Sequence, residues 1–167
     1  MRPPKNLNEI KAGVHIRPAE EDDLDAVVYL WQEMMAFHIE QDEAFTLKKD
    51  AAEIYETYAR DCIANGAKLT LVAEEDCEVV GYIFGEIVSP PPVYPGRKWG
   101  EVSEICVSEM HRNQGLGTEL LHEAERWLFK NDADRIECRI GIHNPVSQSF
   151  WKKHGYVGYM EVCMKEL

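Results

Sequence analysis

Residues 111–118, HRNQGLGT, combine an arginine with two closely spaced glycines, between an apolar run and a helical pattern. A glycine-rich turn that opens a helix is suited to bind phosphate, because the first amides of a helix lack intrahelical partners and the helix dipole is positive at that end. Gly115 and Gly117 also allow a tight turn without any ligand. The stretch is therefore a candidate phosphate-binding loop.

Two common phosphate-binding motifs were compared with this spacing. A P-loop requires GxxxxGK followed by Ser or Thr, and neither the spacing nor the lysine is present. The dinucleotide-binding pattern GxGxxG is met at Gly115 and Gly117, and Glu137 lies where an acidic ribose ligand belongs. The third glycine would fall at Leu120, and the unit follows two helices instead of opening the fold. The missing third glycine and the position after two helices both argue against a dinucleotide-binding site, but they do not exclude it.

Glu101 and Glu104 lie on the strand-like run that leads into this loop. A carboxylate in such a position can act as a general base. Regular strand alternation would place the two side chains on opposite faces, whereas a bulge would alter this arrangement. Either glutamate is a candidate base, and either could instead pair with a basic side chain.

Periodicity predicts the elements that would position these residues, in the order βααβββαβαβ. The prolines of residues 89–97 predict a loop. We expect one domain over residues 1–167, with a loose tail at residues 1–12. The expected strands are residues 13–19, 68–75, 79–88, 99–107, 135–142 and 157–166, and the expected helices are residues 20–37, 47–64, 119–130 and 145–154.

Composition limits the function classes. The chain has 167 residues, 45% of them apolar, which suits one globular domain, and its formal charge of -12 argues against a nucleic-acid binder. We expect residues 20–25, EEDDLD, to form a solvated helix start. The five cysteines lack metal-ligand spacing, so we expect reduced core residues and no metal site. No leader or long apolar segment is evident, which favours the cytoplasm and no membrane partner.

Two motifs together resemble those of the GNAT superfamily of N-acetyltransferases. Residues 107–117, VSEMHRNQGLG, resemble its acetyl-CoA pyrophosphate motif, whose core is Arg/Gln-x-x-Gly-x-Gly/Ala. Residues 144–156, NPVSQSFWKKHGY, resemble its second motif, which runs from an asparagine through an aromatic pair to Gly-Phe or Gly-Tyr. The resemblance extends from about Val14 to Met164. It implies an α/β fold with a mixed, mainly antiparallel central sheet flanked by helices.

The resemblance implies acetyl-CoA as a co-substrate and assigns its binding residues. In the family the pantetheine arm lies along the strand before the loop, and residues of the second motif contact the coenzyme. The positions that match the pantetheine-binding strand are Ile105, Cys106 and Val107. The positions that match the pyrophosphate loop are Arg112, Asn113, Gln114, Gly115, Leu116, Gly117 and Thr118, and those in the second motif are Asn144 and Trp151.

The resemblance also bears on catalysis. Glu104 matches a position where many members carry Asp or Glu, so we favour it as the base, with Glu101 as the alternative. Cys106 has no visible His or Asp partner that would make it a nucleophile, which favours direct transfer in a ternary complex. Trp151 replaces the tyrosine that often serves as general acid. Tyr156 and Tyr159 are alternatives for that role, and none is assigned.

The expected function is acetyl transfer to a primary amine of a small molecule or peptide. The family pattern places the acceptor between the first two helices and the proline-rich loop, here residues 37–45 and 89–97. His38 and Asp42 could share a helix face there. The first alternative is a non-catalytic acyl-CoA-binding sensor or interaction module. The second alternative, ranked below it, is a dinucleotide-binding protein. A homodimer is compatible with the family pattern.

Overall fold

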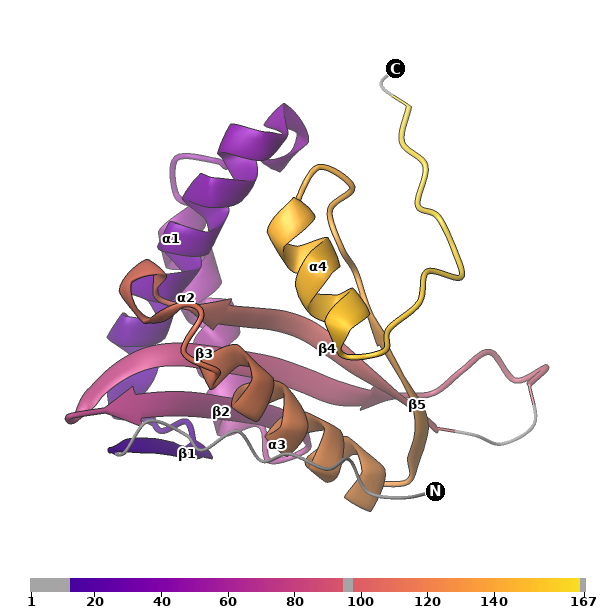
Figure 1. Cartoon of the computed structure of the whole chain (residues 1–167), viewed down its shortest axis with the longest axis horizontal. Coiled ribbons are helices and arrows are strands. Elements are labelled where there is room, and N and C mark those ends of the chain that lie inside the picture. Colours follow the sequence, from indigo (N-terminus) through magenta and orange to yellow (C-terminus); the bar gives the residue numbers. More distant parts are fainter. Residues whose placement is uncertain (1–12, 95–97, 166–167) are drawn as a thin grey trace.

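The computed structural model describes residues 13–94 and 98–165 and shows an α/β fold (Figure 1). One sheet has the strand order β1-β2-β3-β4-β5, and all neighbours are antiparallel except the parallel pair β4 and β5. The strands are β1 (Val14–Pro18), β2 (Lys68–Glu75), β3 (Glu78–Val88), β4 (Lys98–Val107) and β5 (Ala133–Cys138). The helices are α1 (Leu24–Gln41), α2 (Ala51–Ala64), α3 (Leu116–Lys130) and α4 (Pro145–Lys153), and the 3-10 turns are η1 (Glu21–Asp23), η2 (Glu43–Phe45) and η3 (Glu109–His111).

Helices cover both faces of the sheet, and each face has its own apolar core. Helix α3 contributes a row of buried side chains to the core on one face, including Leu120, Leu121 and Leu128. Helices α1 and α2 pack on the opposite face, where Tyr82 and Phe84 of β3 are buried. Alternation along β3 explains the division, because Ile83 lies between these two residues and belongs to the α3 core.

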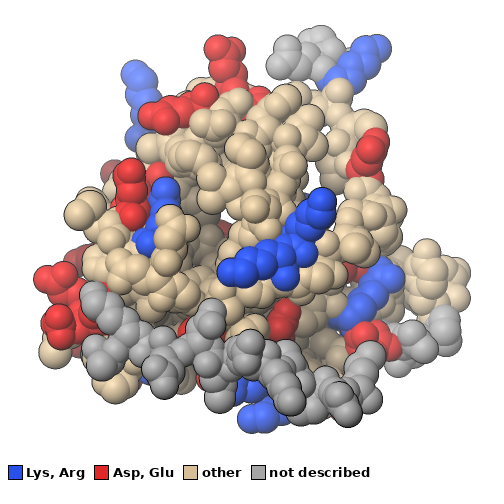
Figure 2. All heavy atoms as spheres, viewed as in Figure 1, with Lys and Arg blue, Asp and Glu red and all other residues tan. Residues whose placement is uncertain are grey.

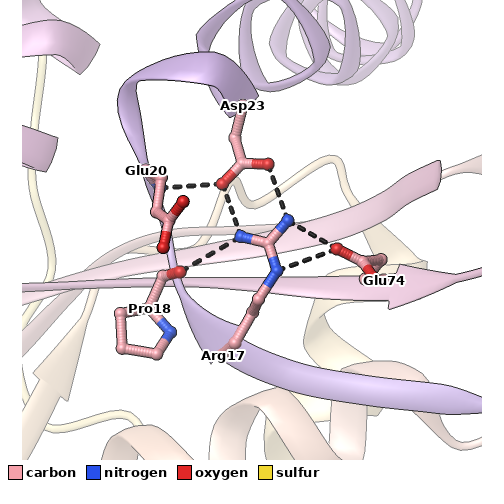
Figure 3. Close-up of polar contacts among 5 residues, drawn as sticks. All are labelled: Arg17, Pro18, Glu20, Asp23 and Glu74. Atoms are coloured by element: carbon pink, nitrogen blue, oxygen red, sulfur yellow. Dashed lines mark hydrogen bonds and ion pairs between the residues drawn. The ribbon is translucent and has the colours of Figure 1, made fainter. Parts of the chain in front are cut away.

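An ion-pair network fixes the start of α1 to the sheet (Figure 3). The guanidinium of Arg17 in β1 donates to both carboxylate oxygens of Asp23, at 2.6 and 2.8 Å, and to Glu74 of β2 at 2.6 and 2.8 Å. Asp23 also accepts the amide of Glu20 at 2.7 Å. Asp23 is 7% exposed, so the expectation of a wholly solvated helix start is wrong at this position. The hydrogen bonds from Arg17 lower the pKa of the Asp23 carboxyl.

The predicted hairpin is confirmed, with β2 and β3 antiparallel and joined through Asp76 and Cys77. Both turn residues have positive φ, at 50° and 66°, as in a two-residue hairpin turn. Helices α1 and α2 begin at Leu24 and Ala51, four residues after their predicted starts, because η1 precedes α1 and the residues before Ala51 form a turn.

Two further expectations differ from the structure. The strand expected at residues 157–166 is wrong for the described part of that range, since residues 157–165 pair with no neighbouring strand and local strand preference alone does not form a strand. All five cysteines are free, but Cys77 and Cys163 are exposed and are therefore not core residues. The expected tail at residues 1–12 lies outside the described residues. None of the described helices is long and apolar enough to cross a membrane.

Candidate functional site

A bulge in β4 brings the two candidate carboxylates to one face of the sheet. Phe84 pairs with Glu104 and Gly85 pairs with Val102, so Ser103 is the extra residue on β4. Glu101 pairs with Glu86, two residues from Phe84. Residues two apart on a strand share a face, and Glu101 and Glu104 therefore both lie on the side covered by α1 and α2.

Two tyrosines hold the carboxylate of Glu104. Tyr55 of α2 donates its hydroxyl to Oε2 at 2.6 Å, and Tyr82 of β3 donates to the same oxygen at 2.8 Å. The ring of Tyr55 stacks on Trp31 of α1, with ring centroids 4.1 Å apart. Burial raises the pKa of Glu104, and the two hydroxyls oppose this by stabilising the carboxylate. Glu104 is thus an oriented carboxylate whose affinity for a proton is raised.

Next to Glu104, β4 has a free edge. The parallel pairing with β5 runs from Lys98 to Val102 and then ends, and Figure 1 shows the two strands separating beyond that point. Residues 104–107 remain paired with β3 on their other side. The backbone of Ile105, Cys106 and Val107 can therefore pair with a bound extended group on the side towards β5.

The glycine loop ends at the beginning of α3. Gly115 is the N-cap residue, with φ of 89°, and Asn113 also has positive φ, at 62°. The first helical bond runs from the amide of Glu119 to the carbonyl of Gly115, so the amides of residues 116–118 precede the helical ladder. A Cβ at Gly115 would meet no atom within 4 Å, which leaves space beside this backbone. The loop therefore has the open positive helix terminus that an anion requires.

Helix α4 braces this loop from the side. The position of a Cβ on Gly117 lies 3.4 Å from the ring of Phe150, and Thr118 Oγ1 lies 3.2 Å from Nε2 of His154. Trp151 is 4% exposed and packs edge-on against Tyr156, so it belongs to the core, while its neighbour Phe150 faces the loop. The hydroxyl of Tyr156 donates to Glu125 at 3.0 Å.

The side chains of Arg112 and Gln114 bind backbone carbonyls just before the glycine loop. Nε of Arg112 donates to the carbonyl of Val107 at 3.1 Å, and its guanidinium forms an ion pair with Glu33 of α1 at 3.1 Å. Gln114 donates its side-chain amide to the carbonyl of Met110 at 3.2 Å. In this arrangement both side chains stabilise the loop, and a direct contact of Arg112 with phosphate stays a prediction.

Asn144 connects α4 to α1. Its Oδ1 accepts the amide of Ser147 at 2.9 Å and so caps α4, and its Nδ2 lies 3.2 Å from Nε2 of His38 on α1. Burial lowers the pKa of His38, which favours the neutral ring whose Nε2 accepts this bond. Asp42 lies at the C-cap of α1, where its carboxylate accepts the amide of Ala44.

Cys106 is a buried thiol on the α1 face. Its Sγ donates to the carbonyl of Leu30 at 3.4 Å, and burial raises its pKa to about 12. The reactive form of a cysteine is the thiolate, which is therefore scarce here at neutral pH. The geometry disfavours a covalent intermediate on Cys106.

A comparison with protein families decides what this arrangement is. The sequence model described as the acetyltransferase (GNAT) family matches residues 28–156, which include both carboxylates, the glycine loop and α4. The chain belongs to the GNAT acetyltransferase family. It is an acetyl-CoA-dependent acyltransferase, and acetyl-CoA is its co-substrate.

Relatives of this GNAT chain agree with the assignment. It is 26% identical over 138 residues to an uncharacterized N-acetyltransferase of Archaeoglobus fulgidus, with 83% of this chain and 89% of that protein covered. A Bacillus halodurans protein solved as a tetramutant has the same fold, with a TM-score of 0.83, 19% identity and coverage of 92% of this chain and 99% of that one. An aminoglycoside N-acetyltransferase solved with CoA has a TM-score of 0.71, 13% identity and coverage of 92% and 94%.

The GNAT site contains groups that suit acetyl-CoA. The open amides at the start of α3 suit a pyrophosphate, and the free edge at residues 105–107 suits an extended arm with amide groups. The family assignment replaces the dinucleotide-binding interpretation, whose GxGxxG motif would need a third glycine at Leu120. Four site residues were not predicted from the sequence: Tyr55, Tyr82, His154 and, as a partner of Asn144, His38. The contacts of all four join residues distant in sequence, so no local pattern marks them.

Proposed function

We propose that this acyltransferase moves an acetyl group from acetyl-CoA to a primary amine of a small molecule or peptide, by direct transfer in a ternary complex. The observation that carries the proposal is the oriented carboxylate of Glu104, held by Tyr55 and Tyr82 beside the free edge of β4. Acetyl-CoA supplies the acetyl thioester when bound. The chain supplies the means to bind it and to deprotonate the acceptor.

Glu104 is the proposed base. An amine acceptor arrives as an ammonium ion with pKa about 10.4, and a carboxylate with a raised pKa is better matched to receive its proton than an ordinary glutamate. The two tyrosine hydroxyls hold one oxygen, Oε2, in place. The other oxygen, Oε1, is the one proposed to accept the proton, directly or through water.

Three carboxylates mark the proposed acceptor surface as attractive to cations. Glu86, Glu101 and Glu104 lie on one face of the β3–β4 pair, and the whole chain carries a formal charge of -12. Glu86 is partly compensated by Lys68, at 3.6 Å. Such a surface favours a cationic amine over an acidic acceptor.

The test of the function is CoA release with a panel of acceptors. Acetyl-CoA is supplied with mono-amines, polyamines, aminoglycosides and peptides with free amino groups, and thiol release is followed over time. We expect sustained release above hydrolysis with at least one cationic primary amine, and no effect of its N-acetylated product. Release no faster than hydrolysis with every amine would contradict the proposed acceptor class.

Replacement of Glu104 by Gln tests the base. We expect Glu104→Gln to lower kcat/KM about 100-fold or more at neutral pH, and by less at high pH where the amine is already deprotonated. Glu78→Gln is the matched control, because Glu78 is an exposed carboxylate at the first residue of β3, six residues from Phe84, which pairs with Glu104. A large loss in Glu101→Gln together with an active Glu104→Gln would move the role of base to Glu101.

A further inference from the structure

Helix α1 holds the turn that precedes the glycine loop. Oε1 of Glu33 accepts the backbone amide of Glu109 at 2.7 Å and the guanidinium of Arg112 at 3.1 Å. Glu109 is the first residue of η3 and Arg112 is its C-cap, and Figure 1 shows this turn beside α1. A single carboxylate oxygen, 76 and 79 residues away in sequence, therefore fixes both ends of the turn.

The same contacts place Arg112 at the end of the free edge of β4. Its Nε donates to the carbonyl of Val107 at 3.1 Å. The amide of Ser108 donates to β3, and because successive peptide groups of a strand point to opposite sides, the carbonyl of Val107 points away from β3. The ring of Phe37, one turn after Glu33 on α1, has its centroid 5.9 Å from Cζ of Arg112. Two side chains of α1 thus hold the guanidinium that closes this edge.

The glycine loop is tied back to the turn. The side-chain amide of Gln114 donates to the carbonyl of Met110 at 3.2 Å, and two loop residues of positive φ then direct the chain into α3. The position of the turn consequently sets the position of the amides of residues 116–118, which suit a pyrophosphate. Because Glu33 fixes the turn, it also determines where these amides point.

We propose that Glu33 is a positioning residue for acetyl-CoA, which acts through the turn and Arg112 to place the amides suited to the pyrophosphate. As an acidic side chain, Glu33 would repel a phosphate, so its effect on the coenzyme is indirect. The same helix carries Trp31, which stacks on Tyr55, so one rigid element supports the coenzyme loop and the surroundings of the proposed base. The role of Glu33 depends on neither the acceptor nor the base.

Binding of two ligands tests this role. Acetyl-CoA has the pyrophosphate, whereas S-acetylpantetheine has the arm and the acetyl group without it. We expect Glu33→Ala to raise the Kd for acetyl-CoA in calorimetry about tenfold or more, because one bond to a charged group and one to a backbone amide are lost. The Kd for S-acetylpantetheine, measured by competition against acetyl-CoA, should stay unchanged. Glu33→Gln should restore most of the affinity, since its side-chain oxygen can accept both bonds.

Glu40→Ala is the matched control, because Glu40 is an exposed glutamate on the same helix. It should bind both ligands as the wild type does. Urea unfolding of each variant establishes that the protein tested is folded. If Glu33→Ala does not fold, Glu33→Asp takes its place, because it keeps the charge and shortens the side chain by one methylene group.

The outcomes that contradict the proposal differ from one another. Binding of acetyl-CoA by Glu33→Ala as tight as by Glu40→Ala overturns it. An equal loss of affinity for both ligands also overturns it, because this loss indicates a general effect on packing and not an effect on the loop. Tighter binding of acetyl-CoA by Glu33→Ala would mean that Glu33 competes with the pyrophosphate for Arg112, which is the reverse of a positioning role.

Discussion

The behaviour of Glu104 depends on two opposing effects of its surroundings. Its position under α1 and α2 removes water from the carboxylate and raises its pKa, while the hydroxyls of Tyr55 and Tyr82 stabilise the charged form. The same two hydroxyls fix one carboxylate oxygen, so orientation and proton affinity are set by the same contacts. Under the proposed function, the tyrosines are positioning residues that act through Glu104.

Replacement of Tyr55 by Phe should shift the pH dependence of the reaction. Loss of a charge-assisted hydrogen bond of about 1.5 kcal/mol corresponds to about one pKa unit, and it raises the pKa of Glu104 further. Glu104 then stays protonated up to a higher pH. We expect the acidic limb of the kcat/KM profile to move upward by about one pH unit, as measured by CoA release across pH.

The matched control for this shift is Tyr58→Phe, one turn later on α2, whose hydroxyl makes no hydrogen bond to Glu104. It should leave the acidic limb in place. A variant Tyr55→Phe with lower activity but an unmoved acidic limb would mean that Tyr55 has only a packing role.

At the scale of elements, the proposed acetyl-CoA site depends on where strand pairing stops. Strand β4 pairs with β3 from Trp99 to Val107, whereas its pairing with β5 ends at Val102. Beyond that point α4 packs against the start of α3. Separation of parallel strands exposes backbone groups that a ligand can satisfy. The loop from Asn113 to Gly115, with two residues of positive φ, then directs the first amides of α3 to the same place.

Gly115→Ala tests the contribution of the loop conformation. A residue with Cβ at φ of 89° costs about 1–2 kcal/mol, and the space beside Gly115 rules out a steric clash as the cause. We expect the free energy of unfolding to fall by about 1 kcal/mol in urea and acetyl-CoA to bind more weakly in calorimetry. Gly66→Ala is the control, because a Cβ there meets nothing within 4 Å and its φ is not positive. Equal stability and affinity in both variants would contradict this role.

At the scale of the whole molecule, the Arg17 network joins three elements that are distant in sequence. Strand β1 supplies Arg17, strand β2 supplies Glu74, and the turn before α1 supplies Asp23 (Figure 3). The network fixes the helix that carries Trp31 and His38 relative to the sheet that carries Glu104. Surface charge differs by region: Figure 2 shows basic side chains near the centre of one face, over α4, whose last turn contains Lys152 and Lys153.

Asp23→Asn should destabilise the fold in a pH-dependent way. The pKa of Asp23 is lowered in the folded state, so its stabilising effect is complete above the unfolded value of about 3.9 and is lost as the pH falls through the folded pKa. We expect a loss of about 1–3 kcal/mol at neutral pH. The difference from the wild type should shrink in acid.

Urea unfolding at neutral pH and at about pH 3 measures this difference, because these two pH values lie on opposite sides of the ordinary pKa of an aspartate. Asp22→Asn provides the control, because Asp22 is adjacent and exposed. A destabilisation that is the same at both pH values would show that the charge of Asp23 is not its cause.

The sequence by itself determined the elements and the cofactor. Apolar periodicity predicted every strand through β5 and all four helices, because each depends on residues within a few positions of one another. The resemblance of residues 107–117 and 144–156 to two GNAT motifs predicted the family and its co-substrate. Glu101 and Glu104 were predicted as the carboxylates near the coenzyme, but their relative placement was left open.

Only the tertiary structure decided which of these residues meet. The bulge at Ser103 depends on the register between β3 and β4, and it brings Glu101 to the same face as Glu104. Tyr55 and Tyr82 reach Glu104 from 49 and 22 residues away, beyond any local pattern. Residues 157–165 have strand-like side chains and form no strand, because a strand depends on pairing with a neighbour and not on local preference alone. Local preference sets the elements, whereas register and long-range contact set the site.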